Sequence, residues 1–201
     1  MPVSMPHYRH HPFSRRGHPP KFWLIYVLAI LFTFHGLLVA YINSTYMESF
    51  APPEVIGALF TIGSSLAVFS FLFISRVLRK VGNRQLTIGL AVIEILTLIT
   101  LGLTSAPAIA ITALVLFLVI NPLIYLNIDI FSESLIGKNE SGTGSKRGLT
   151  LTLMSIASVL APLTMGIIAG PEEILSRVYF VSAGIFSLFV ILVAIPLPMT
   201  G

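Results

Sequence analysis

The chain of 201 residues contains no cysteine, which excludes disulfides and thiolate metal sites. It is also poor in charge, because charged residues make up 10% of the chain, against about 25% in soluble domains. Apolar residues, in contrast, make up 55%. A soluble domain of this size with so few charges would be hard to keep in solution, so the composition favours one integral membrane domain.

Long apolar runs fill the chain after its first 21 residues. Since a helix rises about 1.5 Å per residue, roughly twenty apolar residues span a hydrocarbon core of about 30 Å. Six stretches reach that length: 22–41, 55–75, 85–104, 107–127, 149–169 and 176–196. They predict an all-α, multi-pass protein of the cell (cytoplasmic) membrane, with one six-helix bundle over 22–201. The longest predicted internal loop is the polar, Gly-rich segment at about 130–148.

The basic residues alternate with the apolar runs. If each run crosses once, one side holds eleven of them: Arg9, Arg15, Arg16, Lys21, Arg76, Arg79, Lys80, Arg84, Lys138, Lys146 and Arg147. The other side holds four glutamates and only Arg177. Lys and Arg are retained in the cytoplasm, so we expect both termini to be cytoplasmic. The net charge of +4 is therefore a topology signal, and we expect the lipid bilayer, and no nucleic acid, as a partner.

Residues 1–21 are rich in proline, histidine and arginine. Such a segment cannot bury enough apolar surface to fold, so we predict a disordered, basic cytoplasmic tail. Its four histidines, His7, His10, His11 and His18, could bind a metal. Their spacing defines no coordination geometry, which favours a solvated tail near anionic headgroups. We expect no metal and no cofactor.

A basic motif lies between the second and third apolar runs, at 75–84. It is similar to a Gly-x-x-x-Asp-Arg-x-Gly-Arg-Arg signature. Gly82, Arg84 and Lys80 match that pattern, and Arg79 stands where the signature has its acidic residue.

A second motif joins the fourth and fifth runs, where Asp129 and Glu133 precede Lys146, Arg147 and Gly148. This order resembles an acidic residue followed by an Arg-Gly pair.

A third motif lies inside the fifth run, at 157–166. It is similar to a Gly-x-x-x-Gly-Pro-x-x-Gly-Gly pattern, with Ala161, Pro162 and Gly166 at three of its positions. Together, the three motifs and the six-span topology resemble the major facilitator superfamily of secondary transporters.

The resemblance implies the N-terminal six-helix half of such a transporter, built as a 3+3 inverted repeat. The second half would belong to the same chain if this sequence is a piece of a longer protein, and otherwise to a homodimer or a partner chain. The implied function is secondary active transport of a small solute, with or without a proton, by alternating access. The alternative is a non-transporting membrane scaffold or lipid-binding half-transporter. We expect no enzyme, because no catalytic constellation stands at a plausible site.

Polar groups deep in lipid are functional candidates. Glu94 lies near the middle of the third run, where an ionised carboxylate costs about 2.5–3.5 kcal/mol on insertion scales. It is a candidate proton-coupling residue; the alternative is a neutral, hydrogen-bonded structural acid. His35 in the first run is either a proton relay or, as we favour, a hydrogen-bonding partner of a neighbouring helix. Nothing in the sequence pairs the two residues.

The fourth run carries Asn121, Tyr125 and Asp129 four residues apart, which places them on one helix face. Because the family lines its cavity with the first and fourth spans, the resemblance makes Asn121 and Tyr125 substrate-binding candidates, with His35 and Asn43 from the first span.

The resemblance also suggests a cytoplasmic gate, in which Asp129 would pair with Arg84 or Arg147. The full set of gate candidates is Arg79, Lys80, Gly82, Arg84, Asp129, Glu133 and Arg147. Pro122 and Pro162 break helix hydrogen bonds and are candidates for bending. Ala161 and Gly166 are small residues suited to close helix packing.

Overall fold

The computed structural model describes residues 22–136, 143–172 and 174–195. In these ranges it has helices and no strands, and the predicted tail at 1–21 lies outside them. The helices are α1 (Phe22–Met47), α2 (Pro53–Val81), α3 (Asn83–Leu103), α4 (Pro107–Ile136), α5 (Thr143–Ala169) and α6 (Ser176–Ala194). All six are long and apolar enough to cross a membrane. The prediction of a six-helix, multi-pass membrane protein is confirmed at that level.

Several helices are longer than the apolar runs that predicted them. Helix α4 continues to Ile136 and α5 begins at Thr143, so the predicted loop over 130–148 was wrong at both ends. The extra turns carry polar residues, which hydropathy assigns to a loop although a helix can extend beyond the hydrocarbon core. Helix α2 continues to Val81 and ends at Gly82, whose φ of 85° is a conformation that suits glycine.

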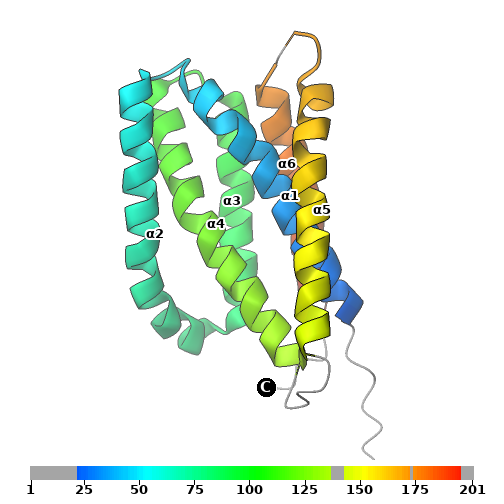
Figure 1. Cartoon of the computed structure of the whole chain (residues 1–201). Coiled ribbons are helices and arrows are strands. Elements are labelled where there is room, and N and C mark those ends of the chain that lie inside the picture. Colours follow the sequence, from blue (N-terminus) through cyan, green and yellow to red (C-terminus); the bar gives the residue numbers. More distant parts are fainter. Residues whose placement is uncertain (1–21, 137–142, 173, 196–201) are drawn as a thin grey trace, which may run out of the picture.

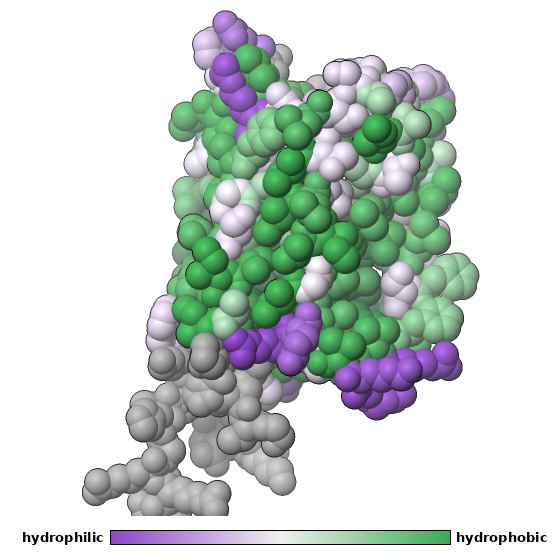
Figure 2. Space-filling view, turned by 180° about the vertical axis from the view of Figure 1, so that it is seen from behind, coloured by the Kyte–Doolittle hydropathy of each residue, from purple (hydrophilic) through white to green (hydrophobic). Residues whose placement is uncertain are grey.

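The helices alternate in direction (Figure 1). The α1–α2, α3–α4 and α5–α6 connections lie at one end, and α2–α3 lies at the other end together with the end of α4 and the start of α5. This second end carries Arg79, Lys80 and Arg84 near Gly82, and Arg147 near the start of α5. We call it the basic end. In the view from behind, hydrophobic surface covers most of the middle and hydrophilic residues gather towards both ends (Figure 2).

Helices α1, α2, α4 and α5 form the near side of the bundle in Figure 1, and α3 and α6 lie behind them. The main contacts join α3 to α6 and α4, α1 to α4, α5 and α6, α2 to α3 and α4, and α5 to α6. Exchanging α1 with α4, α2 with α5 and α3 with α6 leaves this set of contacts unchanged. The bundle therefore consists of two three-helix units with equivalent packing. The first unit is α1–α3 and the second is α4–α6.

Two buried apolar clusters hold the bundle together. One includes Leu38, Leu98 and Leu114, and the other includes Ile124 and Phe186. Both combine side chains from the first and the second three-helix unit. Apolar side chains therefore make much of the contact between the two units.

The predicted packing motif of α5 has two different outcomes. Ala157 and Ala161 are buried, whereas a Cβ on Gly166 would meet no other atom within 4 Å. Gly166 therefore makes no close helix contact among the described residues. The neighbouring apolar side chains of α5, such as Leu163 and Ile167, are exposed. Pro122 and Pro162 both lie inside continuous helices.

Candidate functional site

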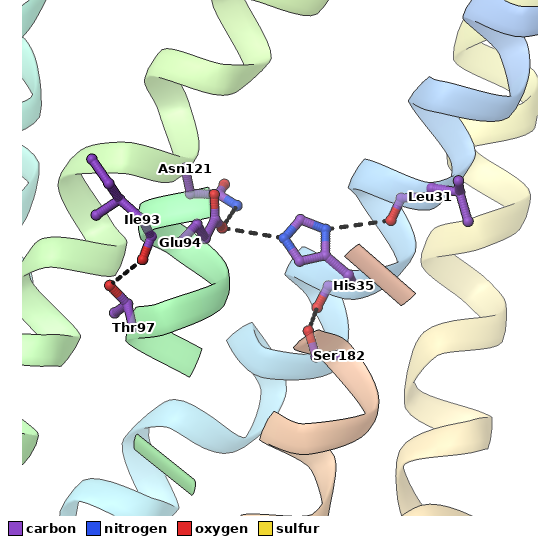
Figure 3. A network of polar contacts seen from close by, with 7 residues as sticks. All are labelled: Leu31, His35, Ile93, Glu94, Thr97, Asn121 and Ser182. Carbon is purple, nitrogen blue, oxygen red and sulfur yellow. Dashed lines mark hydrogen bonds and ion pairs between the residues drawn. The ribbon is translucent and has the colours of Figure 1, made fainter. Parts of the chain in front are cut away.

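A polar cluster lies in the interior of the bundle where α1, α3 and α4 meet (Figure 3). His35 Nε2 lies 3.2 Å from Glu94 Oε1, and Asn121 Nδ2 donates a hydrogen bond of 2.9 Å to the same oxygen. His35 and Glu94 are completely buried. Sequence reasoning had treated these three residues separately, and the structure brings them together.

The roles of the two His35 nitrogens depend on the tautomer. His35 Nδ1 lies 3.3 Å from the carbonyl oxygen of Leu31, and because a carbonyl can only accept, this contact is a hydrogen bond in the tautomer with a proton on Nδ1. The contact between Nε2 and Glu94 Oε1 then needs one further proton, on either atom. With it the pair is neutral overall, as imidazolium and carboxylate or as imidazole and carboxylic acid. Without it two lone pairs face each other and a net negative charge remains.

Two residues of helix α6 contact His35. The ring of Phe186 stacks on His35 with 3.8 Å between centroids and 9° between planes. Ser182 Oγ donates a hydrogen bond of 3.0 Å to the backbone oxygen of His35. A stacked aromatic face also stabilises a cationic ring. The His35 ring is therefore held in its orientation by contacts with α1, α3 and α6.

Glu94 and Asn121 differ in their remaining polar contacts. Glu94 Oε2 is buried and has no hydrogen-bond partner in the described part of the chain. Asn121 lines a cavity of about 410 Å³ between α1, α2, α4 and α5, which we call the central cavity. A Cβ on Gly36 would lie 3.3 Å from Asn121 Nδ2, so the glycine leaves room for this amide. Asn121 thus connects the buried pair with the cavity.

Of the other two candidate substrate-binding residues, Asn43 lines the central cavity and Tyr125 lines a neighbouring one. Asn43 lines the central cavity, and its Oδ1 accepts a hydrogen bond of 2.9 Å from Tyr179 of α6. Tyr125 is 46% exposed and lines a second cavity of about 220 Å³ between α1, α4 and α5. Met154 lines both cavities, which makes them neighbours.

The gate candidates form other pairs than those expected. Arg147 pairs with Glu133 and lines the second cavity together with Asp129. Arg84 donates a hydrogen bond of 3.0 Å to the backbone oxygen of Val193 and another to that of Ala194. Of the ion pairs between described residues, none contains Asp129. Arg84 thus binds the last carbonyls of α6, where a positive charge is favourable.

Sequence reasoning missed several buried polar residues. Ser182 and Tyr179 contact the first helix, as described above. Asn127 is completely buried, and neither polar atom of its side chain has a partner in the described ranges. Its position six residues after Asn121 in an apolar run was the signal that could have identified it. The described residues contain no group of three or more metal-ligating side chains.

No protein-family model, no curated protein and no solved structure matches this chain. The resemblance to the major facilitator superfamily therefore rests on the sequence motifs and the six-span topology.

Proposed function

We propose that the chain is the six-helix half of a proton-coupled secondary transporter of the major facilitator type, which moves a small solute by alternating access. The observation that carries the proposal is the buried His35–Glu94 pair, bonded to a side chain that lines the central cavity. Buried ionisable groups inside membrane proteins mark ion or proton pathways by default.

The helix arrangement supports the transporter class. The contacts are unchanged when the two three-helix units are exchanged, and corresponding helices, such as α1 and α4, run in opposite directions (Figure 1). This is the pattern of a 3+3 inverted repeat. The basic end favours the cytoplasm under the positive-inside rule, which would place both termini there.

The central cavity lies on the side of the bundle formed by α1, α2, α4 and α5. A second six-helix half on this face would enclose the cavity at the interface between two halves, where such transporters bind solute. That half would belong to the same polypeptide, a second copy or a partner chain.

The proton and the solute are coupled through Asn121 in this proposal. The Asn121 side chain lines the cavity and donates to Glu94 Oε1, so a solute that displaces this amide removes one of the two contacts of that oxygen. Loss of the proton removes the contact between α1 and α3 and shifts a helix that lines the cavity. The Arg84 and Arg147 contacts hold the basic end in the described conformation and would break when that end opens.

Proton flux in liposomes tests the proposal. The full chain is reconstituted with a pH-sensitive dye inside, and a pH gradient is imposed in the presence of potassium and valinomycin. A panel of charged and uncharged solutes is present on both sides. We expect at least one solute to accelerate proton entry, and Glu94→Gln to abolish that acceleration. Glu54→Gln, a change at an exposed glutamate of α2, is the matched control and should retain it.

If no solute changes the proton flux, these residues are not a proton-coupled transporter on their own or as a homodimer. The alternative of a scaffold or lipid-binding half-transporter would then be favoured, since it predicts that Glu94 can be neutralised without loss of function.

A further inference from the structure

None of the described residues that line the central cavity is charged. Its walls are mainly apolar and include three phenylalanines, Phe32, Phe60 and Phe117, with Leu37, Leu118 and Met154. The polar lining residues are Thr33, Asn43, Asn121 and Ser158, all of them neutral. Charged side chains line the neighbouring second cavity instead, where Asp129 and Arg147 lie.

Most of the polar groups of the cavity already have partners. Ser158 Oγ donates to the backbone oxygen of Met154, Asn43 Oδ1 accepts from Tyr179, and Asn121 donates to Glu94. Thr33 Oγ1 differs, because it is buried and has no hydrogen-bond partner within the described part of the chain. An unpaired buried hydroxyl is unfavourable unless a ligand or a water molecule satisfies it.

We propose that the solute of the central cavity is uncharged, with a flat or aromatic apolar body and one hydrogen-bonding group that contacts Thr33. This inference rests on the proposed function, because it names the solute class of that transporter. A cavity of about 410 Å³ with apolar walls and a few polar groups is typical of small-molecule sites. Thr33 Oγ1 is buried in the described conformation, and a rotation about χ1 is needed to turn it towards the cavity. It can then donate to a carbonyl group, or donate to or accept from an alcohol.

Ions of either sign lack a charged partner on the described wall of this cavity. An anion would lose its hydration without meeting a cationic side chain, which is strongly unfavourable in an apolar site. A cation would meet no carboxylate, since Glu94 does not line the cavity and its Oε1 already contacts His35 and Asn121.

Three naphthalene probes with the same ring and different charge test the inference. They are 2-naphthalenemethanol (uncharged), 2-naphthoate (anionic) and 2-naphthylmethylammonium (cationic). Binding to the full chain in nanodiscs is measured by equilibrium dialysis, and partition into empty nanodiscs is subtracted. We expect saturable binding of the alcohol and binding at least tenfold weaker for both ions.

Two threonine variants make the test specific to the cavity. Thr33→Val keeps the side-chain shape and should weaken binding of the alcohol by roughly threefold to tenfold, the range of one net hydrogen bond. Thr100→Val is the matched control, because Thr100 lines a different groove and donates to the backbone oxygen of Leu96; binding should be unchanged. Ala40 is exposed and lines the central cavity, so Ala40→Lys should increase binding of 2-naphthoate.

The proposal is wrong if either ion binds as tightly as the alcohol, if no probe binds saturably, or if Thr33→Val leaves binding unchanged. These results are separable from those of the transport assay. Saturable binding of the alcohol without solute-dependent proton flux would refute transport and retain the solute class. Flux driven only by a charged solute would retain transport and refute the solute class.

Discussion

The contact between His35 and Glu94 predicts that substitutions at these two positions are energetically coupled. His35→Phe keeps a ring that can stack on Phe186 but removes both nitrogens, and Glu94→Leu removes the acceptor. Glu94→Leu alone leaves His35 Nε2 and the Asn121 amide without their present partner. In the double variant the His35 part of that penalty disappears, so the two effects should not add.

The size of the coupling can be estimated from the membrane environment. Hydrogen bonds between membrane helices give coupling energies of about 0.6 kcal/mol on average and up to about 1.7 kcal/mol. This pair is completely buried, and charge assistance strengthens it in one of its two arrangements. We therefore expect a coupling energy of about 1–1.7 kcal/mol.

The assay is the free energy of unfolding of the full chain, measured by denaturing detergent titration for wild type, both single variants and the double variant. Thr97→Val in place of Glu94→Leu provides the control cycle, because the Thr97 hydroxyl bonds within its own helix to Ile93. That cycle should be additive within about 0.3–0.5 kcal/mol. If the stability effects of His35→Phe and Glu94→Leu also add within that range, the contact between the two side chains is refuted.

Two further stability predictions follow from close contacts elsewhere. Gly63→Ala should destabilise the bundle by about 1–3 kcal/mol, because the new Cβ would lie 2.7 Å from Leu118. Gly57→Ala is the control, because a Cβ there meets open space. It should be neutral or stabilising by up to about 1 kcal/mol. Arg84→Met should destabilise the bundle by about 1–2 kcal/mol, because it removes two hydrogen bonds to the end of α6. Arg79→Met is the control at an exposed position, and it should change stability by less than about 0.5 kcal/mol. Unfolding titrations measure both sets, and equal effects within either matched pair would contradict the packing described.

The number and approximate positions of the helices were predictable, because the thickness of the bilayer requires long apolar runs. The helix ends were not: the last turns of α4 and the first turns of α5 carry polar residues, so hydropathy predicted a loop at 130–148 where much of the segment is helical. Gly82 was recognised from a motif, and the structure adds its positive φ.

The site was predictable as separate residues and not as a cluster. His35, Glu94 and Asn121 were candidates because polar groups in lipid are unfavourable, but His35 and Glu94 are 59 residues apart and meet only through helix packing. In helices that are apolar on all sides, the periodicity of the sequence does not show which face is buried. One signal was present, since the first and third spans run in the same direction and both residues lie near the middle of their span.

Solute-dependent proton flux through the reconstituted full chain tests the central claim most directly. The lumenal pH is recorded after a pH jump, with and without 2-naphthalenemethanol on both sides, for wild type, Glu94→Gln and Glu54→Gln. We predict that the solute accelerates proton entry in wild type and in Glu54→Gln, and has no effect in Glu94→Gln. Acceleration of the same size in Glu94→Gln would contradict the account, because the proton would then cross without the His35–Glu94 pair.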